Sequence, residues 1–131
     1  MTVNAVAVGN GTGGQGVILA SIVLAEAAGV YEGRRVVQTQ SYGPEARGGA
    51  SRSEVIIARG EIDYPKVIRA DCQLCMSQEA CDKFYTQVKE DGWIIVDADN
   101  VSRLPSHRAV AIPISQIAEE VTGRRITAST V

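Results

Sequence analysis

The sequence predicts an α/β fold, a Rossmann-like arrangement of three layers with helices on both faces of a mainly parallel sheet. Two observations support this prediction. Segments with strand-like and helix-like apolar patterns alternate along the chain, and a glycine-rich turn joins the first expected strand to the first expected helix. With 131 residues, 45% of them hydrophobic and 21% charged, the chain has the size of a single globular domain, residues 1–131.

The expected elements follow from the periodicity of the apolar residues. Short apolar runs bounded by turn residues predict strands at residues 3–8, 35–40, 51–58, 72–76, 93–96 and 109–112. Helical patterns predict helices at residues 16–28, 78–89 and 115–121. Ser77 is expected to cap the second of these helices, and Gly123 is expected to end the third.

The first expected helix is apolar on almost every side, because Ser21 alone interrupts the run from 17 to 25. A surface helix would keep a polar stripe. We therefore expect its outer side to be covered, either by more of this chain or by another subunit. Residues 126–131 resemble the start of a further element, so the sequence is expected to be truncated at its C-terminus.

The glycine-rich run between the first strand and the first helix satisfies the pattern G-x-G-x-x-G in two registers. Backbone amides at such a helix start can meet an anion. The second strand, however, ends in the neutral amides Gln38 and Gln40, where a dinucleotide fold usually places an acid. Gly16 is followed by Val17 rather than by the Lys of a P-loop. The standard modes for NAD and ATP are therefore disfavoured, and close packing of helix on sheet explains the glycines equally well.

The segment between the second and third expected strands contains many residues with special backbone properties. Gly43-Pro44 fixes a turn, and Gly48-Gly49 permits conformations closed to other residues. Tyr42, Glu45 and Arg47 are thereby presented on a shaped loop, where a guanidinium could bind a carboxylate or phosphate at two points. A well-ordered turn with solvated charges is the alternative.

Composition narrows the class of protein. Thirteen basic and fifteen acidic residues leave a net charge of −2, which gives no support to a nucleic-acid surface. The apolar stretch 17–30 is too short to cross a bilayer, and the first residues lack a basic leader. An odd number of cysteines, three, agrees with reduced thiols. These features predict a cytoplasmic protein that contacts no membrane.

The cysteines are expected to serve the core rather than a metal. An ordinary iron–sulfur cluster needs four thiolates. Cys72 and Cys75 lie three positions apart on an expected strand, and this odd spacing points them to opposite faces. Cys81 falls on the apolar side of the next helix, and the lone His107 lies in a loop without a marked nucleophile or orienting carboxylate. No catalytic or metal-binding residue is expected in this chain.

Three motifs together indicate a family. The residues GTGGQG at 11–16, QTQSYGPEARGG at 38–49 and SEV at 53–55 occur in this order. They resemble the gamma subunit of 2-oxoacid:ferredoxin oxidoreductases, and within that family the 2-oxoglutarate type, also called 2-oxoglutarate synthase. The resemblance covers nearly the whole chain.

The resemblance implies a role in a multisubunit enzyme. Members of this family oxidatively decarboxylate a 2-oxoacid to an acyl-CoA and reduce ferredoxin, or run the reverse carboxylation. Thiamine diphosphate lies between the alpha and beta subunits, and iron–sulfur clusters lie on the beta or ferredoxin-like (delta) subunits. By this resemblance the isolated chain binds no cofactor and is inactive. It packs on its partner subunits, and it is a candidate to help cover the bound coenzyme A.

The resemblance also assigns expected roles to the two motifs. The edge expected to meet the coenzyme A diphosphate consists of Gly11, Gly13, Gly14, Gln15 and Gly16. The loop expected to face the substrate or the catalytic subunits consists of Tyr42, Gly43, Pro44, Glu45, Arg47, Gly48 and Gly49. Arg47 is the best single candidate for an anionic partner group.

Two other interpretations stay open. A free-standing Rossmann-like module could use the same glycine turn for a nucleotide or flavin, and it would bind ligand without any partner. A purely structural scaffold would use both motifs for packing between subunits. Self-association of the isolated chain through its apolar surface is a further alternative.

Overall fold

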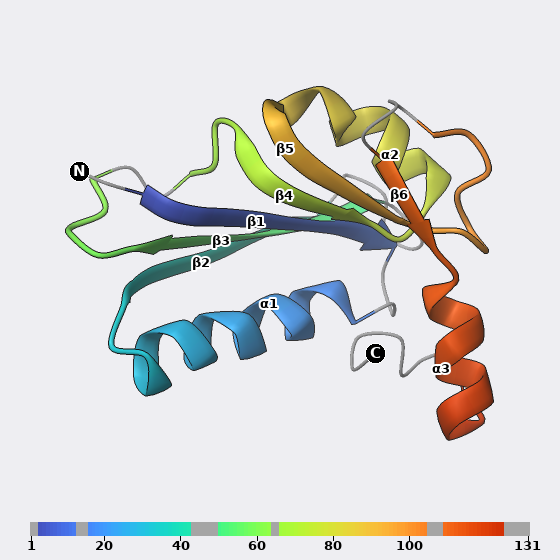
Figure 1. Cartoon of the computed structure of the whole chain (residues 1–131), viewed down its shortest axis with the longest axis horizontal. Helices are drawn as coiled ribbons and strands as arrows, with labels where there is room; N and C mark the ends of the chain where they lie inside the picture. Colours follow the sequence, from blue (N-terminus) through green and yellow to red (C-terminus); the bar gives the residue numbers. More distant parts are fainter. Residues whose placement is uncertain (1–2, 13–15, 43–49, 64–65, 105–108, 125–131) are drawn as a thin grey trace.

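The computed structural model describes residues 3–12, 16–42, 50–63, 66–104 and 109–124 (Figure 1). Six strands form a single sheet in the order β2-β3-β1-β4-β5-β6. The strands are β1 (Val3–Thr12), β2 (Arg35–Tyr42), β3 (Ala50–Ala58), β4 (Ala70–Cys75), β5 (Val88–Asp97) and β6 (Ala109–Ile112). The helices are α1 (Val17–Glu26), α2 (Gln78–Phe84) and α3 (Ile114–Thr122), with a π-helix η1 (Ala27–Tyr31) after α1 and a 3-10 turn η2 (Tyr85–Gln87) after α2.

The sheet is mixed rather than mainly parallel throughout. Strands β1, β4, β5 and β6 pair in parallel, as expected, whereas β3 runs antiparallel to both of its neighbours, β1 and β2. The reason is the short connection between β2 and β3. A parallel return needs a crossover of about a dozen residues or more, and residues 43–49 are too few for one. The predicted mainly parallel sheet is therefore present for β1, β4, β5 and β6 and does not extend to β3.

The helices lie on both faces of the sheet, which agrees with the expected three layers (Figure 1). Helix α1 packs on the face formed by β1, β2 and β3, and α2 lies on the opposite face. Helix α3 joins the α1 side, because its Ala118 forms a buried cluster with Val17 of α1 and with Met76 after β4.

Several boundaries differ from the sequence expectation. The second helix ends at Phe84 instead of reaching residue 89. Val88 starts β5 and pairs with Ala70, so this β-branched residue is part of the sheet and not of the helix. Strand β1 continues to Thr12 through the first glycines, because its pairing with β3 extends to Ala50. Ser77 caps α2 as expected, accepting the Ala80 amide at 3.2 Å, and Gly123 ends α3 in the left-handed conformation.

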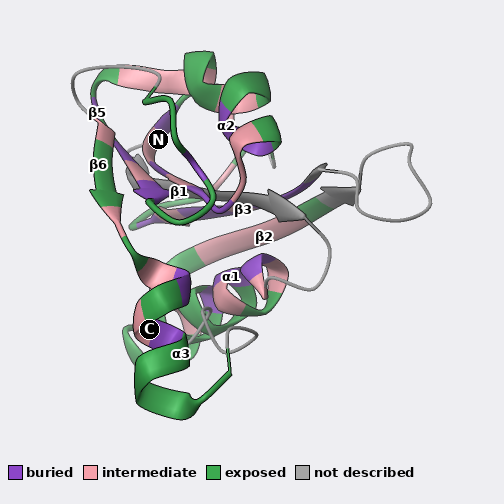
Figure 2. Cartoon of the chain, turned by 90° about the vertical axis from the view of Figure 1, so that its right-hand side faces the viewer, coloured by how far each residue is buried: buried purple, intermediate pink, exposed green. Residues whose placement is uncertain are grey.

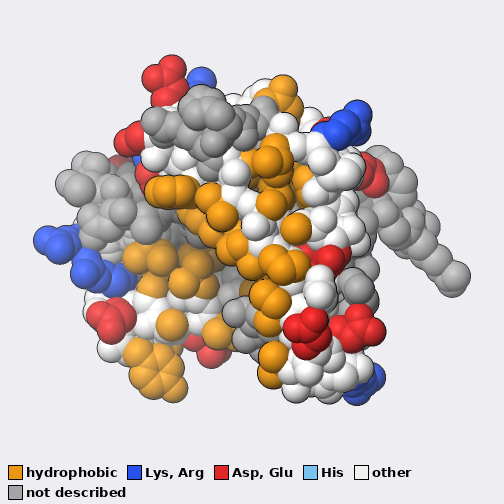
Figure 3. All heavy atoms as spheres, turned by 45° about the vertical axis from the view of Figure 1, so that its right-hand side comes forward, with side chains coloured by type: hydrophobic (Ala, Val, Ile, Leu, Met, Phe, Trp, Pro, Cys, Tyr) orange, Lys and Arg blue, Asp and Glu red, His pale blue; other side chains and the backbone are white. Residues whose placement is uncertain are grey.

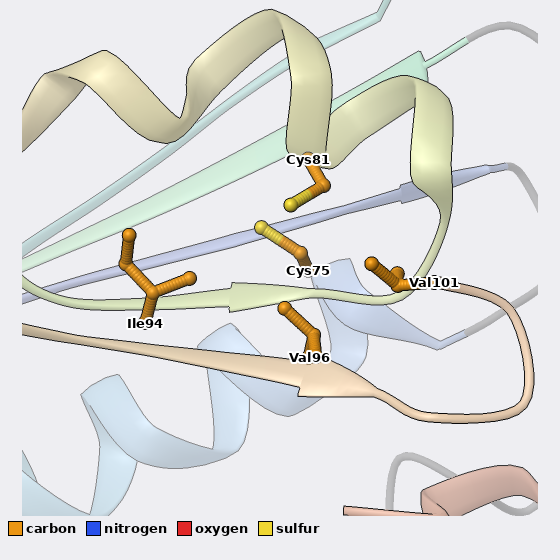
Figure 4. Packing of buried hydrophobic residues seen from close by; sticks show 5 residues of the cluster. All are labelled: Cys75, Cys81, Ile94, Val96 and Val101. Carbon is orange, nitrogen blue, oxygen red and sulfur yellow. The ribbon is translucent and has the colours of Figure 1, made fainter. Parts of the chain in front are cut away.

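The face under α2 holds a closed hydrophobic core. Its fully buried members point toward one another from β4, α2 and β5 (Figure 4). They are Cys75, Cys81, Ile94, Val96 and Val101, each at most 4% exposed. Close packing of this kind leaves few voids, so each side chain there contributes to stability.

The opposite side is only half closed. Small side chains of α1 and η1 meet the sheet, whereas the large apolar ones of α1 point outward: Leu19 is 57% exposed and Val23 is 58% exposed. Figure 2 shows the inner sides of α1 and α3 buried and their outer sides exposed. Hydrophobic side chains gather over the lower part and the centre of the surface in Figure 3. The outer side of the first helix is exposed in this structure, so its cover by another subunit or by further chain stays a prediction. Among the described residues no helix has the length and apolarity to span a membrane.

Candidate binding edge at the ends of the parallel strands

The candidate site lies where the parallel strands end. Helix α1 follows β1 on one face of the sheet, and α2 follows β4 on the other face (Figure 1). Strands β1 and β4 are neighbours. The chain therefore leaves two adjacent strands toward opposite faces of the sheet, which makes this position a topological switch point. Open α/β sheets bind ligands at this kind of position.

The start of α1 has the features of an anion-binding end. Gly16 precedes the helix with φ of 75°, a left-handed conformation that glycine adopts without steric cost. No side chain caps this end, and the first turn contains no acidic residue. The helix dipole therefore meets no neighbouring carboxylate of its own first turn. Val17, buried against Met76 and Ala118, fixes the position of this helix end.

The sheet register brings the two sequence motifs to one edge. Thr12, at the end of β1, pairs with Ala50 at the start of β3. Tyr42, at the end of β2, pairs with Ser51. The connection 13–15 therefore leaves β1, and the connection 43–49 leaves β2, at the same end of the sheet, with β3 between the two strands. The sequence alone did not place these two motifs together.

Three of the expected site residues lie in the described part of the chain. Gly11 is in β1, Gly16 precedes α1, and Tyr42 ends β2. The remaining expected residues lie outside the described residues, namely Gly13, Gly14, Gln15, Gly43, Pro44, Glu45, Arg47, Gly48 and Gly49.

A buried carboxylate at the same edge was missed by the sequence reasoning. Asp97, fully buried at the end of β5, accepts hydrogen bonds from the Ser115 hydroxyl and from Asn100 Nδ2, the latter at 2.7 Å. Its other oxygen accepts the Ser115 backbone amide at 3.3 Å. Asp99 Oδ2 accepts the Gln116 amide at 2.7 Å. Both carboxylates thus cap α3 from another element, and local spacing gives no signal for such a cap.

Gln38 lies where a dinucleotide fold would place its ribose-binding acid, and here it has a structural role. Its Nε2 donates to Ser53 Oγ at 2.9 Å and to Ser21 Oγ at 3.2 Å. The Ser21 and Ser53 hydroxyls are also hydrogen-bonded to each other. This polar seam joins α1 to β2 and β3. Helix α1 is therefore held on the sheet by directional bonds as well as by small apolar residues.

The thiols belong to the core and its surroundings. Cys75 and Cys81 are fully buried, and Gln73 Nε2 donates to Cys75 Sγ at 3.2 Å. Burial raises the pKa of Cys81, a hydrogen bond with Cys75 partly offsets this, and Asp82 adds to the rise. Burial also raises the pKa of the half-buried Cys72, and the Asp71 carboxylate adds to it. Protonated thiols are poor nucleophiles and poor metal ligands, and the described residues contain no group of three or more possible ligands for a metal.

The chain is similar to several known proteins. A family model described as pyruvate ferredoxin/flavodoxin oxidoreductase matches residues 6–131. The chain is 50% identical over 115 residues to the 2-oxoglutarate synthase subunit KorC of Methanocaldococcus jannaschii, covering 85% of this chain and 62% of that protein. It therefore spans less than two thirds of that relative's length.

Solved structures extend the similarity to the fold. The gamma subunit of keto/oxoacid ferredoxin oxidoreductase from Geobacter sulfurreducens matches with a TM-score of 0.82 at 45% identity, covering 96% of this chain and 71% of that one. A 2-oxoglutarate:ferredoxin oxidoreductase from Magnetococcus marinus, with 2-oxoglutarate, coenzyme A and succinyl-CoA bound, matches with a TM-score of 0.83 at 20% identity. That match covers 98% of this chain and 23% of the other, and it shows a common fold.

Proposed function

Because the chain belongs to the pyruvate ferredoxin/flavodoxin oxidoreductase family, we propose that it acts as the gamma component of a multisubunit 2-oxoglutarate:ferredoxin oxidoreductase. The observation that carries the proposal is the 50% identity to a 2-oxoglutarate synthase subunit over most of this chain. The 45% identity to a gamma subunit of the same enzyme class supports it. The proposed reaction converts 2-oxoglutarate, coenzyme A and oxidised ferredoxin to succinyl-CoA, carbon dioxide and reduced ferredoxin, or runs in reverse.

The proposed contribution of this chain is binding and assembly. In the proposed complex, alpha, beta and delta subunits hold the thiamine diphosphate and the iron–sulfur clusters, which supply decarboxylation and electron transfer. The large apolar side chains on the outer side of α1 fit a component that is covered by another polypeptide. The candidate binding edge fits a component that borders the active site and binds ligand there, rather than one that carries the catalytic groups.

We further propose that the edge closes over coenzyme A. The uncapped start of α1, with Gly11, Gly13, Gly14, Gln15 and Gly16 around it, suits the diphosphate of that cosubstrate. The loop from Tyr42 to Gly49, which leaves the same edge, would then face the catalytic subunits or the substrate. Arg47 is the proposed partner of an anionic group there.

Reconstitution tests the proposed function. The alpha, beta and delta subunits of the proposed complex are purified with and without this chain. Viologen reduction is then measured with 2-oxoglutarate and coenzyme A, and with pyruvate as the competing 2-oxoacid. The proposal predicts activity on 2-oxoglutarate that needs this chain. Full activity without the chain, or tight binding of a flavin or nucleotide by the chain alone, would favour the free-standing module instead.

Replacing Arg47 tests the proposed edge within the complex. Arg47→Ala should raise the KM for coenzyme A or weaken assembly, because an anion loses a two-point contact worth roughly 1.5–3 kcal/mol. Ala46→Ser, at a position of the same loop with no proposed role, is the matched control for general disturbance of the loop. Unchanged kinetics with intact assembly for Arg47→Ala would contradict this role.

A further inference from the structure

Strand β2 forms one edge of the sheet. Among the described residues it pairs with β3 alone, so its other side presents a row of backbone amides and carbonyls. Natural edges are usually protected by proline, charged residues or bulges. From Val36 to Tyr42 the strand contains no proline and no charged residue. This edge therefore has the hydrogen-bonding groups and the strand-forming side chains needed to pair with another strand.

A groove of about 460 Å³ runs beside this edge, between β2 and the end of α1 with η1. Apolar side chains lining it include Ile22, Ala25, Val30 and Val36. Gly29 lets η1 approach β2 closely, because a Cβ on it would lie 2.8 Å from Val36 Cγ2. The π-helix thus shapes the groove wall, and π-helical turns often occur at functional sites.

The charges of the groove favour an acidic occupant. Arg34 and Arg35 line it at the start of β2, against a single carboxylate, that of Glu26. Arg35 is exposed, so its guanidinium can reach a group on an added strand. The groove therefore offers apolar contact along its length and positive charge at one end.

We propose that the β2 edge and this groove form a strand-addition site for an extended segment of a partner polypeptide. That segment carries apolar side chains at alternate positions and a carboxylate that meets Arg35. A strand added about 4.8 Å from β2 pairs with its free backbone groups and directs every second side chain toward the groove. This proposal concerns the isolated chain and does not rest on the assignment of 2-oxoglutarate.

A second copy of this chain is the competing occupant, and the charges count against it. In antiparallel self-pairing, each Arg35 would face the end of the partner's strand near Tyr42. Strand β2 contains no carboxylate to receive the guanidinium. A partner segment with its own carboxylate can form an ion pair with Arg35, which a second copy of β2 cannot.

A peptide pair tests the backbone pairing directly. The probe is a capped nine-residue peptide in which valine alternates with threonine and a glutamate occupies one end. We expect saturable binding to the purified protein in fluorescence anisotropy, with slower hydrogen exchange of the β2 amides. Two forms, N-methylated on one or the other set of alternate amides, should differ by at least about tenfold, because one set faces β2. No binding of the parent peptide, or equal loss with both methylated forms, would overturn the proposal.

Matched variants test the groove. Val30→Asp and Arg35→Glu should each weaken peptide binding by at least about fivefold, because one buries a charge against an apolar chain and the other repels the glutamate. Two control variants lie outside the groove: Leu19→Asp, on α1, and Arg69→Glu. Both should leave peptide binding unchanged. Equal weakening by Leu19→Asp would contradict the site. Sedimentation tests the competing occupant. A dimer that dissociates in the Val30→Asp variant and is not displaced by the peptide would identify a second copy of this chain as the occupant of the groove.

Discussion

The two faces of the sheet are completed in different ways. On the α2 side, Cys75, Ile94 and Val96 are sealed from water by residues of this chain. On the α1 side, small residues and a polar seam meet the sheet, while Leu19 and Val23 point outward. The comparison teaches that apolar composition alone does not define a core. One face stabilises the domain, and the other leaves large apolar side chains exposed.

The largest expected effect separates the two faces by stability. Ile94→Ala should lower the free energy of unfolding by about 2–5 kcal/mol, because it leaves a cavity in a packed core. Val23→Ala, on the outer side of α1, should change it by less than about 0.5 kcal/mol. Urea unfolding followed by circular dichroism measures both. Similar costs for the two variants would show that the α1 side is also a core.

A second prediction concerns the carboxylate that ties α3 to the α1 side. Asp97→Ala should cost roughly 1–3 kcal/mol, since it leaves the hydroxyl and the backbone amide of the buried Ser115 without their acceptor. Hydrogen exchange should be faster in α3 and unchanged in α2. Asp97→Asn, which keeps one acceptor oxygen, is the milder control. Uniform acceleration in both helices would contradict a local capping role.

The polar seam under α1 should give a smaller and cooperative effect. In a double-mutant cycle, Ser21→Ala and Ser53→Ala should be coupled by about 0.5–1.5 kcal/mol, because their hydroxyls bond to each other and to Gln38. The exposed Ser102→Ala, paired with Ser53→Ala, should give additive effects. Additivity for Ser21 and Ser53 would mean that the seam does not hold α1.

The smallest expected effect is in thiol chemistry. Alkylation by iodoacetamide requires the thiolate, and the pKa of Cys72 is raised by burial and by Asp71. Its alkylation should therefore rise at a higher pH than that of a free cysteine. Asp71→Asn removes the repelling carboxylate, so the profile should move back toward lower pH, by less than the shift that burial causes. Cys75 and Cys81 should react only on unfolding. A shift of the profile to higher pH would contradict this electrostatic account.

Features set by neighbouring residues were predictable from the sequence. The Ser77 cap, the Gly123 stop and the four-residue strand Ala109–Ile112 depend on local patterns, and the structure contains all three. The all-round apolar character of the first helix was also visible in the sequence, and the structure places its large side chains Leu19 and Val23 on the exposed outer side. The family resemblance is confirmed by the comparisons.

Features set by distant partners were not predictable. The α2 end at Phe84 depends on the pairing of Val88 with Ala70. The Asp97 cap joins residues that are 18 positions apart. The register that brings the glycine turn and the loop after Tyr42 to one edge appears only in the assembled sheet.

Hydrogen exchange of this protein, alone and assembled with the proposed alpha and beta subunits, tests the central claim that a partner covers the α1 side. The account predicts that amides of α1, η1 and β2 become slower to exchange on assembly, while those of α2 and β5 stay unchanged. Protection confined to the α2 side, with α1 exchanging as in the isolated chain, would contradict it.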